Sequence, residues 1–413
     1  MTAATFFLAM SVFGLLLSIQ TYFRLRLFAV QMVPTFLVGW FRGELAMQTL
    51  ALEALVTGAF VAKGVLSTTA GQFGMAITLV SWTLLILSHR RGVNAGAEVD
   101  AALAPAGLVA GKGVGFFHGF WKPFGFSHPS VRRVTDIEYG ESLPGDKGGR
   151  NLLDLYLPQA GTPEDRRPVL LQVHGGAWLI GDKREQGKPL MNHLTARGWI
   201  CVAMNYRLSP QGTMPDHIVD VKRALAWIRE HIAEYGGDPE FICITGGSAG
   251  GHLSSLAALT ANDAAFQPGF ESVDTRVKAC VPVYGVYDFL DRAGLRSLGS
   301  MAEAIGPQVF KCTPEENPEL WDSVCPIERV HSDAPPFFIV QGSHDSLVYA
   351  EEAVQFANAL EAKSNQPVLR VEHLGAQHAF EVFHSPRSAH FVRGATAFLE
   401  NIRAEHQQDQ PTY

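Results

Sequence analysis

The distribution of hydrophobic and polar positions divides the chain into two unlike parts. Residues 1–23 contain no charged side chain, and a second uncharged stretch runs from residue 64 to residue 88. Each stretch is long enough to cross a bilayer, which needs about 20 apolar residues. From about residue 131 the pattern changes to short apolar runs bounded by Gly, Pro or Asn. The sequence therefore predicts a transmembrane helical region over residues 1–91, followed by a region that alternates strands and helices.

The second part has the pattern of an α/β fold. Two early runs, 134–140 and 151–158, predict strands, and a last strand is expected in the segment that begins at residue 368, before His378. Five further runs are almost continuously apolar, which is typical of strands buried on both faces of a parallel sheet: 168–176, 198–206, 241–247, 277–285 and 335–343. The clearest helix is Asp216–Tyr235, with apolar residues at helical spacing. We expect an α/β fold, a mostly parallel sheet flanked by helices, over residues 131–405, and a frayed polar tail over 406–413.

The first part is expected to hold three membrane spans, near residues 4–23, 45–66 and 71–88. A signal peptide is disfavoured because no basic residue precedes the first apolar run and no clear cleavage site follows it. A third span over Leu45–Ala62 puts all the flanking arginines on one side, which is then the cytoplasmic side. Those arginines are Arg24, Arg26, Arg42, Arg90 and Arg91. The sequence thus predicts an integral membrane protein whose C-terminal region faces the cytoplasm.

Two features of this first part leave alternatives open. Glu53 lies in the middle of the third candidate span and would need a polar partner inside the bundle. Otherwise this segment lies on the membrane surface or re-enters it. Residues 92–130 are expected to form a Gly-rich and aromatic-rich linker or pocket cover. Its aromatic segment, residues 115–126, suits the headgroup interface, the mouth of an apolar pocket, or a clamp between the two parts.

Charge and cysteine content exclude several classes of function. The formal net charge is −7 with no basic patch, which argues against a nucleic-acid partner. The five cysteines are irregularly spaced without a CxxC pair, so neither a disulfide framework nor a zinc site is expected. We expect no metal and no cofactor. Oligomeric state is left open.

One tight corner in the α/β part points to chemistry. Residues 246–250 read Gly-Gly-Ser-Ala-Gly, between a predicted strand at 242–245 and a predicted helix at 253–259. This is the G-x-S-x-G pattern, in which a strained turn lifts the hydroxyl of Ser248 above the sheet as a nucleophile. Flanking glycines are required because a Cβ there would strike neighbouring backbone. The same turn directs the N–H of Ala249 toward an oxyanion.

A second motif, HGGAW, follows an earlier predicted strand. Its small residues let backbone amides turn toward an incoming carbonyl oxygen, so Gly176 and Ala177 are the expected donors of an oxyanion hole. His174 precedes the nucleophile in the chain, so we expect it to orient this loop together with Gly175 rather than to act as the base.

The acid and the base are expected on loops after later strands. Asp345 follows the strand at 335–343, and His378 follows the last strand. The order Ser248, Asp345, His378 is that of an α/β-hydrolase triad, in which the imidazole takes the serine proton and the carboxylate fixes its tautomer. Weaker candidates are His344, His373, His384, Asp288 and Asp333.

With these motifs, the region from about residue 131 to residue 402 resembles the α/β-hydrolase superfamily, in particular the hormone-sensitive-lipase-like carboxylesterases. The resemblance rests on HGGAW (174–178), YRLSP (206–210), GGDPEFICITGGSAGGH (236–252), GSHDSLV (342–348) and QHAF (377–380). It implies a serine esterase without a cofactor. Ala177 stands where the family usually has a third glycine, and its methyl group narrows the side of the expected active site that receives the acyl group. Such variants also resemble the kynurenine-formamidase and feruloyl-esterase branches, and the whole chain resembles membrane-anchored actinobacterial esterases.

The sequence therefore predicts a membrane-anchored serine esterase or lipase that hydrolyses carboxylic, lipid-like esters through an acyl-enzyme. Its partners are the ester substrate and the lipid bilayer. Two alternatives remain: an amidase, peptidase or formamidase of the same fold, and a membrane-tethered binding domain without catalytic activity.

Overall fold

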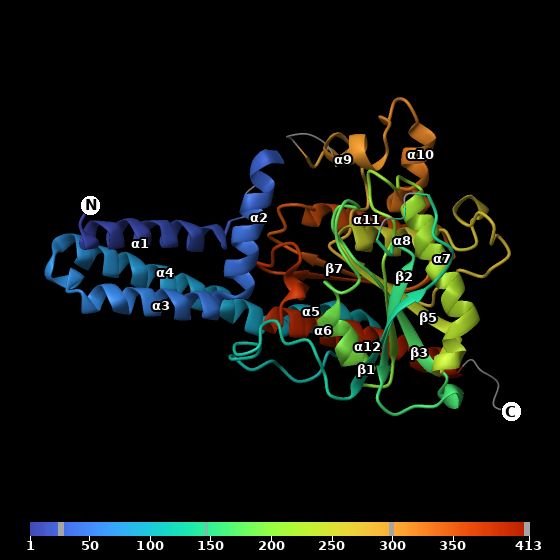
Figure 1. The fold of residues 1–413 in the computed structure, drawn as a ribbon, viewed down its shortest axis with the longest axis horizontal. Coiled ribbons are helices and arrows are strands. Elements are labelled where there is room, and N and C mark those ends of the chain that lie inside the picture. Colours follow the sequence, from blue (N-terminus) through green and yellow to red (C-terminus); the bar gives the residue numbers. More distant parts are fainter. Residues whose placement is uncertain (24–28, 145, 147, 297–300, 409–413) are drawn as a thin grey trace.

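The structure is a computed structural model with two visibly different parts. A bundle of long helices from the N-terminal segment extends from one side of an α/β part (Figure 1). The structure describes the whole chain except residues 24–28, 145, 147, 297–300 and 409–413, and the side chains of residues 29–32.

Three long helices form the N-terminal bundle. They are α1 (Ala3–Gln20), α3 (Ala46–Ala62) and α4 (Thr69–Asn94). Helix α2 (Ala29–Glu44) crosses the end of this bundle next to the α/β part (Figure 1). Helix α2 includes Pro34.

The apolar helices agree with the expected spans only in part. Ala3–Gln20 and Thr69–Ala106 are each long and apolar enough to cross a membrane. Val33–Glu44 and Ala46–Ala62 meet that criterion only as a pair, bent by 89° at their junction. The described residues therefore provide two candidate spans, or three if the bent pair counts as one.

The charged residues of the bundle separate into exposed and buried groups. Arg90 and Arg91 are exposed where α4 approaches the α/β part. Arg42 is instead buried, and its Nη2 lies 2.7 Å from Glu53 Oε1. Glu53 therefore has the polar partner that its position in an apolar helix requires. Arg24 and Arg26 lie outside the described residues.

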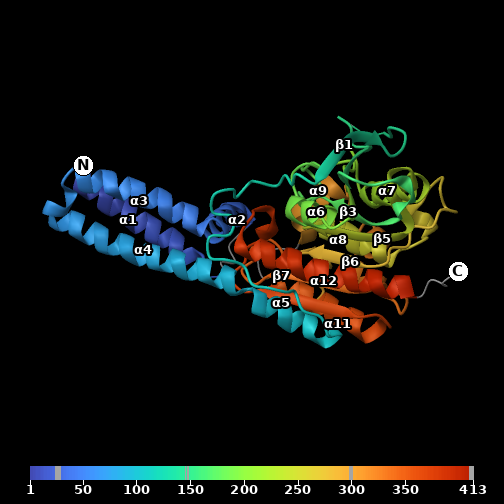
Figure 2. The ribbon, with the colours of Figure 1, turned by 90° about the horizontal axis from the view of Figure 1, so that it is seen from below.

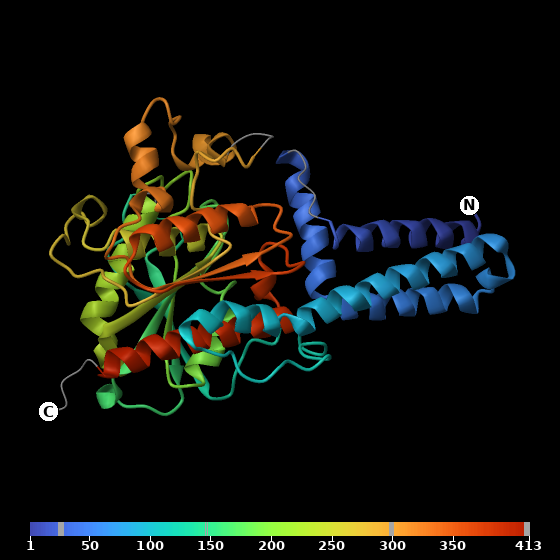
Figure 3. The ribbon, with the colours of Figure 1, turned by 180° about the vertical axis from the view of Figure 1, so that it is seen from behind.

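The segment expected as a linker is partly helical. Helix α5 (Gly96–Leu103) continues nearly in line with α4, and its Val99 and Leu103 are fully buried. They pack with the helix α12 (Pro386–Gln408) against the sheet, and the two helices lie side by side in Figures 2 and 3. Helix α5 therefore forms part of the core of the α/β part.

The aromatic segment after α5 is fastened to the base of the bundle. Its backbone carbonyls accept hydrogen bonds from the side chains of Gln48 at 3.1 Å and His89 at 2.6 Å. The rings of Phe117, Trp121 and Phe124 nevertheless remain exposed. The segment thus presents aromatic side chains to the surroundings beside the candidate spans.

The α/β part is built on one eight-stranded sheet. The strand order is β1-β2-β4-β3-β5-β6-β7-β8, with β1 and β2 antiparallel to their neighbours and the other pairs parallel. The predicted mostly parallel sheet is therefore confirmed. The strands are β1 Val131–Glu138, β2 Leu152–Pro158, β3 Arg167–Val173, β4 Ile200–Met204, β5 Gly237–Gly247, β6 Cys280–Val283, β7 Phe337–Gly342 and β8 Val368–His373.

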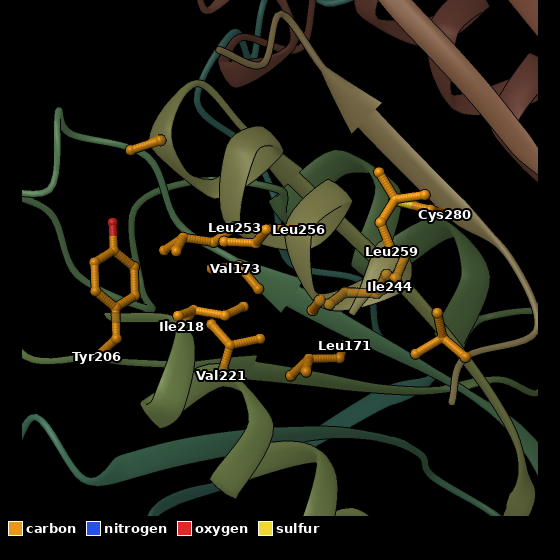
Figure 4. Close-up of a cluster of buried hydrophobic side chains, with 14 of the residues drawn as sticks. Leu171, Val173, Tyr206, Ile218, Val221, Ile244, Leu253, Leu256, Leu259 and Cys280 are labelled. Carbon is orange, nitrogen blue, oxygen red and sulfur yellow. The ribbon is translucent and has the colours of Figure 1, made fainter. Parts of the chain in front are cut away.

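Helices cover both faces of the sheet and create two apolar cores. One core includes α7, α8 and α11, and the other includes α5, α6 and α12. Figure 4 shows the first core, where leucine, valine and isoleucine side chains of β3 and β5 meet those of α7 and α8. The remaining helices are α6 Lys188–Thr195, α7 Asp216–His231, α8 Ala249–Leu259, α9 Met301–Val309, α10 Pro318–Ser323 and α11 Ala350–Lys363. Short 3-10 turns lie at Val65–Ser67, Ala104–Ala106, Pro163–Asp165, Ile232–Tyr235, Ala264–Phe266, Pro326–Arg329 and Phe380–Val382.

The end of the chain is more regular than the sequence predicts. Helix α12 continues to Gln408, through the first residues of the expected polar tail 406–413. The remainder of that tail lies outside the described residues.

Candidate active site

Ser248 occupies a strained turn between β5 and α8. Its backbone angles are φ 58° and ψ −121°, a conformation that costs a residue with a side chain about 1–3 kcal/mol. The turn is tightly packed, because a Cβ on Gly250 would overlap the carbonyl oxygen of Val173. The Ser248 side chain is partly exposed. The local geometry is thus the one that a G-x-S-x-G elbow requires.

The loop after β3 lies directly against this serine. A Cβ built on Gly175 would approach the Cβ of Ser248 to 3.0 Å. The N–H of Gly175 is occupied, since it donates to Gln186 Oε1 at 2.7 Å. Within the described part of the chain, the N–H groups of Gly176 and Ala177 have no hydrogen-bond partner. The loop that approaches Ser248 therefore carries two backbone donors without a partner among the described residues.

The same loop is held in an unusual conformation by its tryptophan. Ala177 and Trp178 have positive φ angles of 53° and 62°. The Trp178 ring is buried and packs against His252 and Phe289, with ring centroids 5.2 Å apart in each case.

Ala249, the expected third donor, begins α8, and the first N–H groups of a helix have no partner within it.

His174 is built into the fold rather than exposed for catalysis. Its ring stacks on Tyr206 at 4.3 Å, and its Nδ1 donates to the carbonyl oxygen of Gly175 at 2.8 Å. Burial lowers the pKa of His174 to about 4, so the ring is neutral at pH 7. The Tyr206 hydroxyl also donates to the His174 carbonyl oxygen at 3.0 Å. These contacts fit a role in supporting the loop.

Asp345 and His378 are brought together from different loops. His378 Nδ1 lies 2.7 Å from Asp345 Oδ2, and both side chains are buried. The carboxylate also accepts hydrogen bonds from the backbone N–H groups of Leu347 and Val348 at 2.9 and 2.8 Å. Gln341 Nε2 donates to Oδ2 at 3.1 Å. These donors fix the carboxylate so that it orients the imidazole.

The imidazole of His378 is also packed between aromatic rings. Tyr284 lies at a centroid distance of 4.4 Å, and Phe36 meets it edge-on at 5.9 Å. Within the described residues, no hydrogen bond joins Ser248 to His378, but Tyr284 adjoins both loops. A Cβ on Gly247 would lie 2.7 Å from the Tyr284 hydroxyl oxygen. Catalytic hydrogen bonds are often long without substrate and tighten when it binds.

The other candidate histidines have different partners. His373 Nδ1 lies 3.1 Å from Glu98, and His344 Nδ1 donates to the carbonyl oxygen of Thr21 at 3.1 Å. His384 packs edge-on against another histidine ring. All three side chains therefore contact the N-terminal segment or its continuation rather than a carboxylate near Ser248.

The other candidate acids lie in different surroundings. Asp288 is buried. Its Oδ1 forms an ion pair with the Arg292 guanidinium, and its Oδ2 accepts a hydrogen bond from the backbone N–H of Arg292. Asp333 is exposed on the loop before β7. Neither is hydrogen-bonded to a histidine that could serve Ser248.

A buried tyrosine–glutamate pair beside His378 was not expected from the sequence. The Tyr284 hydroxyl donates to Glu381, which lies three residues after His378. Burial raises the pKa of Glu381 to about 7, although the hydrogen bond from Tyr284 opposes this shift. Only the position of Glu381 close to the histidine motif hinted at it.

Helix α2 contributes the second unexpected group. Phe36 contacts the His378 ring. The indole N–H of Trp40 donates a hydrogen bond of 2.7 Å to the carbonyl oxygen of Ala379, the residue after His378. Glu44 forms a fully buried ion pair with Arg387. Phe36, Trp40 and Glu44 are spaced four residues apart and share one face of α2. Their spacing is visible in the sequence, but the surface that they meet is not.

A metal site is not apparent in this region. Among the described residues, no group of three or more His, Cys, Asp or Glu side chains is arranged to hold an ion.

The mostly parallel sheet, the serine elbow and the Asp–His pair after later strands define an α/β hydrolase. A crystal structure of esterase B from Lactobacillus rhamnosis has the same fold, with a TM-score of 0.57 and 22% sequence identity. That match covers 68% of this chain and 88% of the other.

Sequence comparisons identify the family. The BD-FAE family model matches residues 153–360. The chain is 43% identical over 396 residues to the probable carboxylic ester hydrolase LipM of Mycobacterium tuberculosis, covering 90% of this chain and 88% of LipM. It is 42% identical over 329 residues to esterase LipQ of the same organism, covering 75% and 76%. The chain belongs to the BD-FAE family of hormone-sensitive-lipase-like α/β hydrolases and is a carboxylic ester hydrolase.

Proposed function

We propose that this esterase is anchored in a membrane and uses Ser248 as nucleophile, His378 as base and Asp345 as the orienting acid. The 2.7 Å contact between His378 Nδ1 and Asp345, on the loops that follow the last two strands, carries the proposal. With Nδ1–H committed to the carboxylate, Nε2 is the nitrogen left to accept the serine proton. The strained turn at Ser248 and the free amides beside it support the same assignment.

The first half of the reaction forms an acyl-enzyme. Ser248 Oγ attacks the ester carbonyl carbon as its proton passes to His378 Nε2. The carbonyl oxygen becomes an oxyanion that accepts hydrogen bonds from the N–H groups of Gly176, Ala177 and Ala249. One such donor is worth about 2.7–4 kcal/mol in the transition state. The imidazolium then protonates the alcohol oxygen as the carbon–oxygen bond breaks.

The second half releases the acid. Water attacks the acyl carbon while His378 takes one of its protons. The bond from the acyl carbon to Ser248 Oγ then breaks, and the imidazolium returns its proton to Oγ. The products are a carboxylic acid, an alcohol and the original enzyme, so no cofactor is consumed.

We infer that the substrate is a lipid-like ester met at the bilayer surface. Helix α2 crosses the end of the candidate spans (Figure 1), and its residues Val33, Leu37 and Phe41 are exposed at a spacing of four. An apolar face on such a helix is typical of one that lies in the headgroup region. The exposed rings of the aromatic segment add to this apolar surface.

The proposed orientation places the α/β part on the cytoplasmic side. Arg90 and Arg91 lie at the α/β end of α4, as the positive-inside rule requires. Protease treatment of intact cells should then leave the α/β part uncut, whereas the same treatment of inverted vesicles should degrade it. Cleavage in intact cells contradicts this orientation.

The nucleophile assignment can be tested with a fluorophosphonate probe on the full chain in detergent. Wild-type protein and the exposed-serine control Ser127→Ala should be labelled equally, and Ser248→Ala should not be labelled. Peptide mapping should place the phosphonate on Ser248. Equal labelling of Ser248→Ala rules out Ser248 as the nucleophile.

A further inference from the structure

A cavity of about 260 Å³ lies between the helices of the N-terminal bundle, apart from Ser248, and it opens to the bundle surface, where its lining residues Phe13 and Leu52 are exposed. Its walls come from α1, α3 and α4, which run alongside one another in the bundle (Figures 1 and 2), and from Arg42 of α2. The lining is mostly apolar and includes Met10, Phe13, Leu17, Leu52 and Val56. With the membrane anchoring proposed above, on which this inference rests, the cavity faces hydrocarbon rather than water.

One end of this cavity carries a buried guanidinium. Arg42 Nη2 donates to Glu53 Oε1 at 2.7 Å, to Ser18 Oγ at 2.7 Å and to the carbonyl oxygen of Gly14 at 3.1 Å. Arg42 is buried, with a relative exposure of 9%. Its Nε is also buried and has no hydrogen-bond partner among the described residues. An unused donor thus remains on a side chain that lines the cavity.

The cavity has a direction. Its lining residues on α1 run from Phe7 to Leu17, which spans about 15 Å of helix. Arg42 binds α1 at Gly14 and Ser18, near the end of α1 that approaches the α/β part. The end away from Arg42, toward Phe7, therefore lies deep in the bundle and is lined by apolar side chains and the hydroxyl groups of Ser11 and Thr78, whereas the charged end faces the α/β part.

We propose that this cavity binds one acyl chain of a membrane amphiphile, with a carbonyl or carboxylate oxygen at its head accepting a hydrogen bond from Arg42. The apolar walls match a hydrocarbon chain, and the guanidinium at one end matches an oxygen acceptor. Ionisable side chains within membrane spans are costly and usually mark ligand or ion sites. The assignment is independent of the serine chemistry, so either can fail without the other.

The competing explanation is that the Arg42–Glu53 pair only holds the helices together. Polar side chains do join helices in membranes without binding any ligand. In that case only annular lipid would contact the cavity. Such lipid would bind equally to wild-type protein and to a variant whose cavity is filled.

The test uses full-length protein in phosphatidylcholine nanodiscs with a photoactivatable palmitic acid. Gly14→Leu fills the cavity from α1, where a Cβ would have ordinary contact with Glu53 at 3.5 Å. Val56→Trp fills it from α3. The matched control is Gly58→Leu on α3, where a Cβ would meet nothing within 4 Å. We expect both filled variants to lose at least about tenfold in crosslinking, with Gly58→Leu unchanged.

Two further measurements keep the test decisive. Hydrolysis of p-nitrophenyl butyrate reports whether each variant is folded. Excess unlabelled palmitic acid should displace the probe from wild-type protein, and this second result does not depend on whether any variant folds. Crosslinks should map to α1 and α3. Labelling that is unchanged in Gly14→Leu and Val56→Trp, or not displaced in wild-type protein, overturns the proposal.

A probe pair distinguishes the two sources of the acyl chain. Preferential labelling by the acid over its methyl ester assigns the site to free fatty acids. Equal labelling by acid and ester, above that by a photoactivatable alkane, assigns it to ester lipids. Labelling by the alkane equal to both removes any role of Arg42 and contradicts the proposal.

Discussion

The N-terminal bundle and the α/β part place their polar groups in opposite ways. In the α/β part, Ser248, Asp345 and His378 each lie on a loop just after a strand, and backbone N–H groups fix them there. In the bundle, Arg42 is buried between helices, where it pairs with the partly exposed Glu53 and is joined to α1 by a hydrogen bond to Ser18.

The two arrangements meet at helix α2. One face of α2 holds the loop of His378 through Phe36, Trp40 and Glu44, while Arg42 on the same helix reaches into the bundle. The proposed base is therefore supported by the α/β part through Asp345 and by the N-terminal helices through α2. The predictions below measure how much each support contributes.

The largest effect is expected from the support inside the α/β part. Asp345→Asn removes the carboxylate that fixes the His378 tautomer, and kcat for p-nitrophenyl butyrate should fall about 10⁴-fold with KM little changed. Asp333→Asn, at an exposed acid before the same strand, should behave as wild type. An Asp345→Asn enzyme with normal kcat would show that this carboxylate does not orient the base.

Next is the ion pair that joins α2 to α12. Glu44→Gln leaves the buried Arg387 without its charged partner and should destabilise the folded protein by about 3–5 kcal/mol, measured by thermal unfolding in detergent. Replacing both residues by Met should recover much of that loss. Arg276→Gln, at an exposed pair, should cost less than about 1 kcal/mol. A Glu44→Gln protein as stable as wild type would mean that α2 is not fastened by this pair.

A smaller, pH-dependent effect is expected at Glu381. Its folded-state pKa of about 7 is raised from 4.5, so the folded protein binds this proton more tightly than the unfolded chain. The resulting stabilisation is complete below pH 4.5 and is lost as the pH rises through 7. The shift corresponds to about 3 kcal/mol as an order of magnitude.

Glu381→Gln keeps an acceptor for the Tyr284 hydroxyl without the charge. Its melting temperature should therefore match wild type at pH 4.5 and exceed it at pH 8. Equal pH dependence of the two proteins would show that Glu381 is not held neutral by burial.

The smallest effect is expected from the aromatic contact between α2 and the base. Phe36→Ala removes an edge-to-face contact worth about 1 kcal/mol, so kcat should fall roughly fivefold while KM stays nearly constant. Leu37→Ala, its exposed neighbour on α2, is the control. If both variants lose the same activity, α2 acts through general stability rather than through His378.

Sequence reasoning succeeded where the signal is local. Each predicted strand is present, because strands buried on both faces are continuous apolar runs, and the motif HGGAW and the elbow at Ser248 lie at strand ends as expected. The contact of Asp345 with His378 follows from that placement, since the carboxyl ends of parallel strands share one edge of the sheet.

The rest depended on contacts between distant segments. Helix α5 was expected as linker because Gly and Ala are common there, yet Val99 and Leu103 are buried against the sheet. The partners of Phe36, Trp40 and Glu44 lie more than 300 residues away in the chain, and no spacing rule links them. Glu381 likewise becomes unusual only once the fold buries it.

The most direct test is a structure of the full chain in a nanodisc with a phosphonate ester inhibitor. We expect phosphorus bonded to Ser248 Oγ, His378 Nε2 within about 2.6–3.2 Å of that oxygen, and the phosphonyl oxygen about 2.7–3.1 Å from the amides of Gly176, Ala177 and Ala249. Phosphorus on another side chain, or an imidazole of His378 turned away from Ser248, would contradict the proposed catalytic relay.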